Sequence, residues 1–157
     1  MPRIQPLEPP YEARLQAQYD QIMPPGAPPL VLFRTVAVSE RAWRKFRGGS
    51  LLDGRLISLR EREILIDRTC ALAGCEYEWG VHVTAFAKAA RLTAAEIAAT
   101  CSPDGAAETW SEAERALIAV ADALHARATL TDDEFTALRI WYDDAQTLEI
   151  IMLCGFY

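Results

Sequence analysis

Three residues with chemically useful side chains lie close together in the sequence: Cys75, Glu78 and His82. In a helix with 3.6 residues per turn, the spacing i, i+3 and i+7 places their side chains on one face. Glu63 lies upstream, on the segment before Gly74. A thiol, two carboxylates and an imidazole are more than a hydrophobic core requires. We therefore expect proton transfer, thiol chemistry or metal binding at this place.

The pair Glu78 and His82 favours proton transfer. Residues four apart on a helix are neighbours, so Glu78 can hydrogen-bond the imidazole and fix its tautomer. Glu63 reaches the same face if the helices on either side of Gly74 pack as an antiparallel pair. A carboxylate oriented against a histidine is a common general acid/base. On this interpretation His82 is the catalytic acid/base and Glu78 and Glu63 orient it, as a decarboxylation or isomerisation of a carbonyl compound requires.

Cys75 leaves thiol chemistry open. A dithiol peroxidase of the Cys-x-x-Cys type needs a resolving thiol three residues after the first cysteine, and that position is Glu78. Cys70 lies five residues before Cys75. On a continuous helix these two side chains point apart, although a bend at Gly74 changes this. A single-cysteine peroxidase or thiol sensor based on Cys75 remains an alternative, whereas the Cys-x-x-Cys mechanism is excluded.

A metal site is not expected, because the chain has two histidines and lacks both His-Glu-x-x-His and Cys-x-x-Cys paired with histidines. Each residue also has an ordinary structural role: Cys75 as a small buried hydrophobe, His82 as a structural histidine, Tyr77 and Trp79 as core aromatics. With all of them on one segment and Glu63 behind it, the functional interpretation is favoured. We expect Cys75 in the pocket, Tyr77 and Trp79 as substrate contacts, and no metal or cofactor.

The segments around this face are predicted to be helices. A Ser or Thr followed three residues later by Glu forms a capping box, and such pairs open apolar-periodic segments at Ser58, Thr93, Ser111 and Thr131. No alternating apolar pattern bounded by hairpin turns occurs, so no sheet is expected. The predicted fold is all-α, with about seven to eight helices in a single domain over residues 1–157. Residues 1–50 form an N-terminal helical extension of that domain.

Composition excludes several classes of protein. The net charge of −6 and the lack of any run of Lys and Arg argue against nucleic acid as a partner. No apolar stretch reaches the ~18 residues of a membrane span, so we expect no membrane contact and a cytoplasmic location. The four cysteines are expected to be thiols rather than a disulfide framework. The apolar final segment, residues 148–157, ends without a polar cap, which indicates a missing C-terminal helix or contact with another subunit.

The sequence resembles the carboxymuconolactone decarboxylase family, within the alkylhydroperoxidase-D-like superfamily. The Tyr-Glu-Trp-x-x-His string at Tyr77 to His82 is typical of one branch of it. The resemblance runs from about Leu56 to Tyr157 and rests on these matching segments: Arg62-Glu63, residues 75–82, residues 92–97, Trp110, residues 114–117, residues 121–125 and Gly155-Phe156-Tyr157. Members of this branch usually continue with another helix, so the resemblance also implies that the C-terminal helix is missing.

The resemblance implies an alkylhydroperoxidase-D-like helical bundle that assembles as a homo-oligomer, a trimer or hexamer, with its site near a subunit boundary. It implies a lyase acting on a small carboxylated lactone or related carbonyl compound. On the pattern of the peroxidase branch, Glu63 takes the proton-relay position, Cys75 the first cysteine, Glu78 the second and His82 the histidine. Glu78 departs from that pattern and argues against a dithiol peroxidase. The alternatives are a peroxiredoxin-like single-cysteine antioxidant or thiol sensor, and a non-catalytic ligand-binding oligomer.

Overall fold

The computed structural model describes residues 3–54, 56–103, 105 and 107–157. These ranges contain nine α-helices, one 3₁₀ turn and no strand, so the all-α prediction is confirmed with nine helices in place of seven to eight. Within the same ranges, no helix is both long enough and apolar enough to cross a membrane. The helices are α1 (Ala13–Ile22), α2 (Val31–Val36), α3 (Glu40–Gly49), α4 (Leu59–Leu72), α5 (Glu76–Phe86), α6 (Ala94–Thr100), α7 (Glu112–Arg127), α8 (Asp132–Arg139) and α9 (Asp144–Phe156), with the 3₁₀ turn η1 at Ala107–Thr109.

The chain divides into two compact units, Met1–Ser50 and Leu51–Tyr157. The first unit contains α1 to α3 and is held together by aromatic rings. The Trp43 ring lies 5.5 Å from that of Tyr19 and 5.7 Å from that of Phe33, centroid to centroid. Its indole Nε1–H donates to the side chain of Gln18 at 2.7 Å. A single aromatic cluster therefore forms the core of the first unit.

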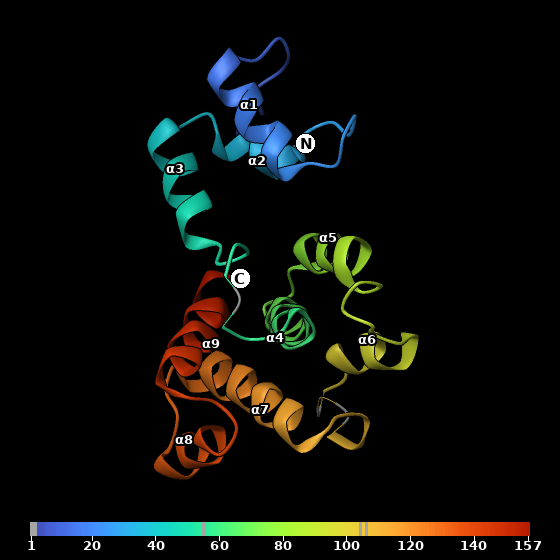
Figure 1. Cartoon of the computed structure of the whole chain (residues 1–157), viewed down its shortest axis with the longest axis vertical. Coiled ribbons are helices and arrows are strands. Elements are labelled where there is room, and N and C mark those ends of the chain that lie inside the picture. The colour runs from blue at the N-terminus through green and yellow to red at the C-terminus, as the bar shows by residue number, and fades with distance from the viewer. Residues whose placement is uncertain (1–2, 55, 104, 106) are drawn as a thin grey trace. The chain divides into compact units, whose positions relative to one another are not determined.

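The second unit is built around α4. All residues from 62 to 70 are buried, and a helix that is buried all round must have neighbours on every side. Figure 1 looks nearly along α4 and shows α5, α6, α7 and α9 around it. One hydrophobic cluster joins Leu65 and Ile66 to residues of α7, α8 and α9. A second joins Ile64 to residues after α5, to α6 and to α7.

Helix starts in the second unit follow the local sequence. The capping boxes predicted at Ser58, Thr93, Ser111 and Thr131 are all confirmed, each with the side chain and backbone hydrogen bonds in both directions. A fifth box, not predicted, opens α9 at Asp143. Each box satisfies backbone N–H groups that would otherwise lack a partner at a helix start.

Two arginines on α4 fix its position against α6 and α7. Arg68 is buried; its Nε donates to Asp122 at 2.7 Å and its Nη1 to the carbonyl oxygens of Thr100 and Ser102 at 3.0 and 2.6 Å. Arg60 pairs with Glu114 at 2.6 Å and also with Glu96. These contacts tie α4 to the end of α6 and to α7.

Candidate active site

The connection between α4 and α5 is a Schellman turn. Gly74 has a φ of +65°, a conformation that glycine adopts without strain. The Gly74 N–H donates to the carbonyl oxygen of Ala71 at 3.1 Å and the Cys75 N–H to that of Cys70 at 2.9 Å, which is the bonding pattern of this motif. The turn ends α4 at Leu72 and leads directly into α5 at Glu76. In Figure 1, α4 is seen nearly end-on and α5 is seen from its side. The two helices therefore cross instead of lying antiparallel as we expected.

The turn brings Glu63 of α4 against His82 of α5. The Oε2 atom of Glu63 lies 2.8 Å from Nδ1 of His82. The two side chains are 0% and 3% exposed. A carboxylate paired with an arginine can only accept hydrogen bonds, so the proton of this contact belongs to Nδ1. The contact therefore sets the histidine tautomer and leaves Nε2 free for chemistry.

Arg62 holds the other oxygen of Glu63. Its Nε and Nη2 atoms lie 2.8 and 2.7 Å from Oε1, and Nη1 donates to the carbonyl oxygen of Leu52 at 3.0 Å. The guanidinium also lies over the Phe86 ring, 5.3 Å from its centroid. Both contacts to Oε1 are charge-assisted, and charge-assisted hydrogen bonds are stronger than those between neutral groups. The buried carboxylate is thus neutralised by a cation that has its own fixed place.

Glu78 lies on the other side of the imidazole. Its Oε1 is 3.7 Å from Nε2 of His82, one helical turn along α5, and its side chain is 17% exposed. Burial raises the pKa of Glu78, while the charge of His82 acts in the opposite direction. A carboxyl group with a raised pKa exchanges protons closer to neutral pH. Glu78 is the member of this group that solvent reaches.

Aromatic rings enclose the imidazole. The Tyr157 ring lies nearly perpendicular to it with 4.9 Å between centroids, and the centroid of the Phe86 ring lies 5.3 Å away. Burial, then the negative charges of Glu78 and Glu63, raise the pKa of the Tyr157 hydroxyl. Tyr157 therefore stays a neutral phenol, and the rings keep water away from most of His82.

The structure brings together three of the predicted site residues: Glu63, Glu78 and His82. Cys75 lies at the N-cap of α5 and is exposed. Tyr77 is half exposed. Trp79 packs against the core and donates its Nε1–H to Thr100 at 3.0 Å. In the described part of the chain, no three His, Cys, Asp or Glu side chains are placed to hold a metal ion.

Sequence reasoning missed two residues that contact this group, Arg62 and Tyr157. Arg62 precedes Glu63 in the matching segment of the sequence, but nothing in the sequence indicated that its side chain is buried and pairs with Glu63. Tyr157 is separated from His82 by 75 positions, and its aromatic type alone is compatible with any part of the core. Neither residue was predicted as a site residue.

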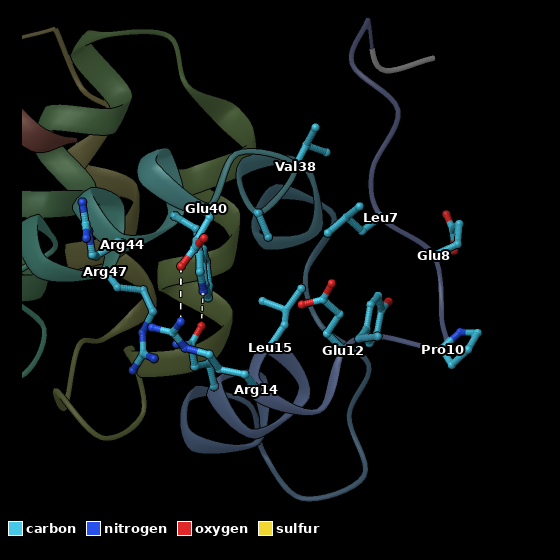
Figure 2. A pocket seen from close by; sticks show the side chains of 14 residues that line it. Leu7, Glu8, Pro10, Glu12, Arg14, Leu15, Val38, Glu40, Arg44 and Arg47 are labelled. Atoms are coloured by element: carbon cyan, nitrogen blue, oxygen red, sulfur yellow. Dashed lines mark hydrogen bonds and ion pairs between the residues drawn. The ribbon is translucent and has the colours of Figure 1, made fainter.

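A pocket of about 540 Å³ lies elsewhere, in the first unit (Figure 2). Its lining combines apolar side chains such as Leu15 and Trp43 with charged ones such as Arg14, Glu40 and Arg44. Figure 2 shows Arg14 directed at Glu40, an ion pair of 3.3 Å between exposed side chains. All lining residues belong to residues 7–47, so none of the predicted site residues takes part in this pocket.

Comparison with known protein families decides the classification. The sequence model of the carboxymuconolactone decarboxylase family matches residues 39–123, more than half of the chain. The chain belongs to the carboxymuconolactone decarboxylase family. The matched range contains Glu63, Glu78 and His82 and ends before Tyr157. No curated protein matches the sequence. The resemblance is confirmed at the level of the family, which is compatible with both a lyase and a peroxidase.

Asp67 is a second buried carboxyl group on α4, one turn after Glu63. It is 1% exposed, and neither of its oxygens has a hydrogen-bond partner among the described residues. Burial, then the charge of Glu63, raises the pKa of Asp67 to about 8. The unfolded chain ionises this group near pH 4. Between these two values folding takes up a proton, so the stability that depends on a neutral Asp67 is lost as the pH rises.

We predict that the Asp67→Asn variant removes this pH dependence. Relative to wild type, its free energy of unfolding should increase by about 2–4 kcal/mol between pH 4 and pH 8, because asparagine has no proton to lose. Urea denaturation at a series of pH values measures this difference. The exposed Asp133→Asn variant serves as control and should follow the wild-type curve. Parallel curves for wild type and Asp67→Asn would show that Asp67 is not protonated in the fold.

Proposed function

We propose that this protein is an acid/base enzyme that decarboxylates a small carboxylated lactone, or transfers a proton on a related carbonyl compound. The observation that carries the proposal is the buried contact between Glu63 and His82 at 2.8 Å. An imidazole with one nitrogen committed to a buried carboxylate is oriented and keeps its second nitrogen for the substrate. Membership in the carboxymuconolactone decarboxylase family supports the substrate class.

In this proposal His82 is the general acid/base and works through Nε2. Glu63 holds the proton on Nδ1, and Arg62 keeps Glu63 in place and neutralised. Glu78 lies beside Nε2 on the side that solvent reaches, and there the substrate would enter. Tyr77, half exposed on the same helix, and Trp79 are proposed as substrate contacts, and Cys75 as a residue at the edge of the site.

The chemistry needs one bond cleavage and one proton transfer. The bond between the ring carbon and the carboxylate breaks, carbon dioxide leaves, and the electron pair delocalises toward the lactone carbonyl. Glu78 passes a proton from solvent to Nε2 of His82, which becomes an imidazolium; His82 then gives this Nε2 proton to the carbon and returns to the neutral form with its proton on Nδ1. General acid/base catalysis of this kind contributes about 10²–10⁴-fold in rate.

One observation favours a second candidate function. Cys75 is exposed at the start of α5, where a single thiol is open to peroxides. A single-cysteine antioxidant or thiol sensor is therefore the alternative activity. A non-catalytic oligomer that binds a ligand on the same scaffold is the remaining alternative, and it would show binding without turnover.

We predict that His82→Ala lowers kcat for carbon dioxide release from carboxymuconolactone and related carboxylated lactones at least about 100-fold, because it removes the acid/base. Glu63→Gln should lower kcat less, since it disturbs the orientation of the imidazole. Product formation is followed by carbon dioxide capture and by mass spectrometry of the lactone.

The matched control for this experiment is His125→Ala, because His125 is the other histidine of the chain and is exposed on α7. This variant should retain wild-type turnover. Wild-type turnover by His82→Ala would contradict the proposal, and so would a wild-type protein that binds such lactones without releasing carbon dioxide.

We further propose that the chain assembles as a trimer or hexamer. Leu148, Ile151 and Met152 share one face of α9 and are 63%, 36% and 55% exposed in the single chain. Ile140 and Trp141, just before α9, are exposed as well. Contiguous exposed apolar side chains of this kind are typical of contact surfaces between subunits.

We predict that Leu148→Glu weakens this assembly, because it places a charge in the centre of the apolar face. Light scattering after size-exclusion chromatography should give a trimer or hexamer for wild type and a smaller species for the variant. Thr129→Glu, which adds the same charge at an exposed position outside α9, should behave as wild type. A wild-type protein that is monomeric at micromolar concentration would contradict the proposed assembly.

A further inference from the structure

The Schellman turn places two thiols at matching positions. Cys70 and Cys75 are joined by the backbone hydrogen bond that spans the whole turn, from Cys75 N–H to the carbonyl oxygen of Cys70 at 2.9 Å. A Cα atom lies about 1.5 Å from its own N atom and about 2.4 Å from its own carbonyl oxygen, so this hydrogen bond limits the separation of the two Cα atoms to about 6.8 Å. Disulfides span Cα separations of about 4.4–6.8 Å. The backbone thus holds the two cysteines within reach of a disulfide bond.

The side chains at these two positions also tend to meet. In Schellman motifs, the side chains of the two residues joined by the bond across the whole turn are commonly in contact. Cys70 has no exposed surface, whereas Cys75 is exposed. Burial, followed by the charges of Cys75 and Glu78, raises the pKa of the Cys70 thiol to about 12. Cys70 is therefore a protonated thiol beneath an accessible one.

We propose that Cys70 and Cys75 form a reversible disulfide when the protein meets a peroxide. The Cys75 thiolate attacks one peroxide oxygen, the oxygen–oxygen bond breaks, and an alcohol or water leaves, which gives a sulfenic acid on Cys75. The Cys70 sulfur then attacks the Cys75 sulfur. A disulfide forms, and the sulfenic oxygen leaves as water with the proton of Cys70. The peroxide is reduced by two electrons, and the two thiols are oxidised by the same number.

This modification site is independent of the acid/base proposal. Its two sulfurs belong to the end of α4 and the N-cap of α5, and the same two helices carry Glu63 and His82. In a straight helix, two cysteines with the spacing Cys-x4-Cys cannot form a disulfide, since their side chains point apart. Here the two cysteines can approach each other because the chain leaves the helix at Gly74, which has a positive φ. Cys101 and Cys154 lie outside this turn.

The test uses the reduced wild-type protein titrated with hydrogen peroxide, after which free thiols are blocked with N-ethylmaleimide. Trypsin releases residues 69–88 as one peptide, because Arg68 and Lys88 are the flanking basic residues. We expect this peptide to carry no label and to be lighter by two hydrogen atoms than its reduced form. Chymotrypsin, which cleaves after Leu72, should leave its two halves joined until dithiothreitol is added.

Variants separate the two steps. Cys70→Ala should accumulate a sulfenic acid on Cys75 that dimedone traps, and Cys75→Ser should leave Cys70 reduced. Cys101→Ser is the matched control, since Cys101 is exposed outside the turn, and should form the disulfide as wild type does. Three results would overturn the proposal: Cys70 labelled while Cys75 is over-oxidised, a Cys75–Cys75 link between two chains, or both thiols labelled in full at excess peroxide.

Discussion

Glu63 is a carboxylate without exposed surface, and the rest of the site is arranged around it. A buried charge is stable only with partners, and removing one partner of a buried ion pair costs about 3–5 kcal/mol. Here the partners are Arg62 on one oxygen and His82 on the other. Because Arg62 adjoins Glu63 on α4 and His82 comes from α5, the ionised Glu63 requires the two helices to cross at one place. The turn at Gly74 connects the two helices, and the packing of α4 holds Glu63 at the place where they meet.

The same arrangement makes the two faces of the imidazole group different. On the inner side, Glu63 and Arg62 form a buried ion pair. On the outer side, Glu78 is only partly buried, lies beyond hydrogen-bond distance from Nε2, and has a raised pKa. In the proposed function, Glu63 orients the histidine and Glu78 exchanges protons with solvent. This division of roles favours acid/base chemistry, although the exposed Cys75 nearby gives the molecule a thiol that can react separately.

Local sequence signals predicted the parts of this fold that depend on neighbours in the chain. The capping boxes at Ser58 and Ser111 were predictable because all their partners lie within three residues. The proximity of Glu78 and His82 followed from helical spacing in the same way. Arg62 could not be predicted as the partner of Glu63, since adjacent residues on a helix usually face apart. Tyr157 could not be assigned because its contact with His82 depends on how α9 packs. Cys75 was expected as the first residue of the helix, on one face with Glu78 and His82, and the Schellman turn makes it the N-cap residue just before α5.

The central claim is that Glu63 fixes the proton of His82 on Nδ1. Nitrogen-15 NMR of the histidine side chains measures this directly, with the exposed His125 as internal reference for an unconstrained ring. At a pH where both rings are neutral, His82 should show a protonated Nδ1 and an unprotonated Nε2, whereas His125 should show the opposite tautomer that free histidine prefers. An Nε2-protonated His82 would contradict the account, because the nitrogen assigned to the substrate would then carry the fixed proton.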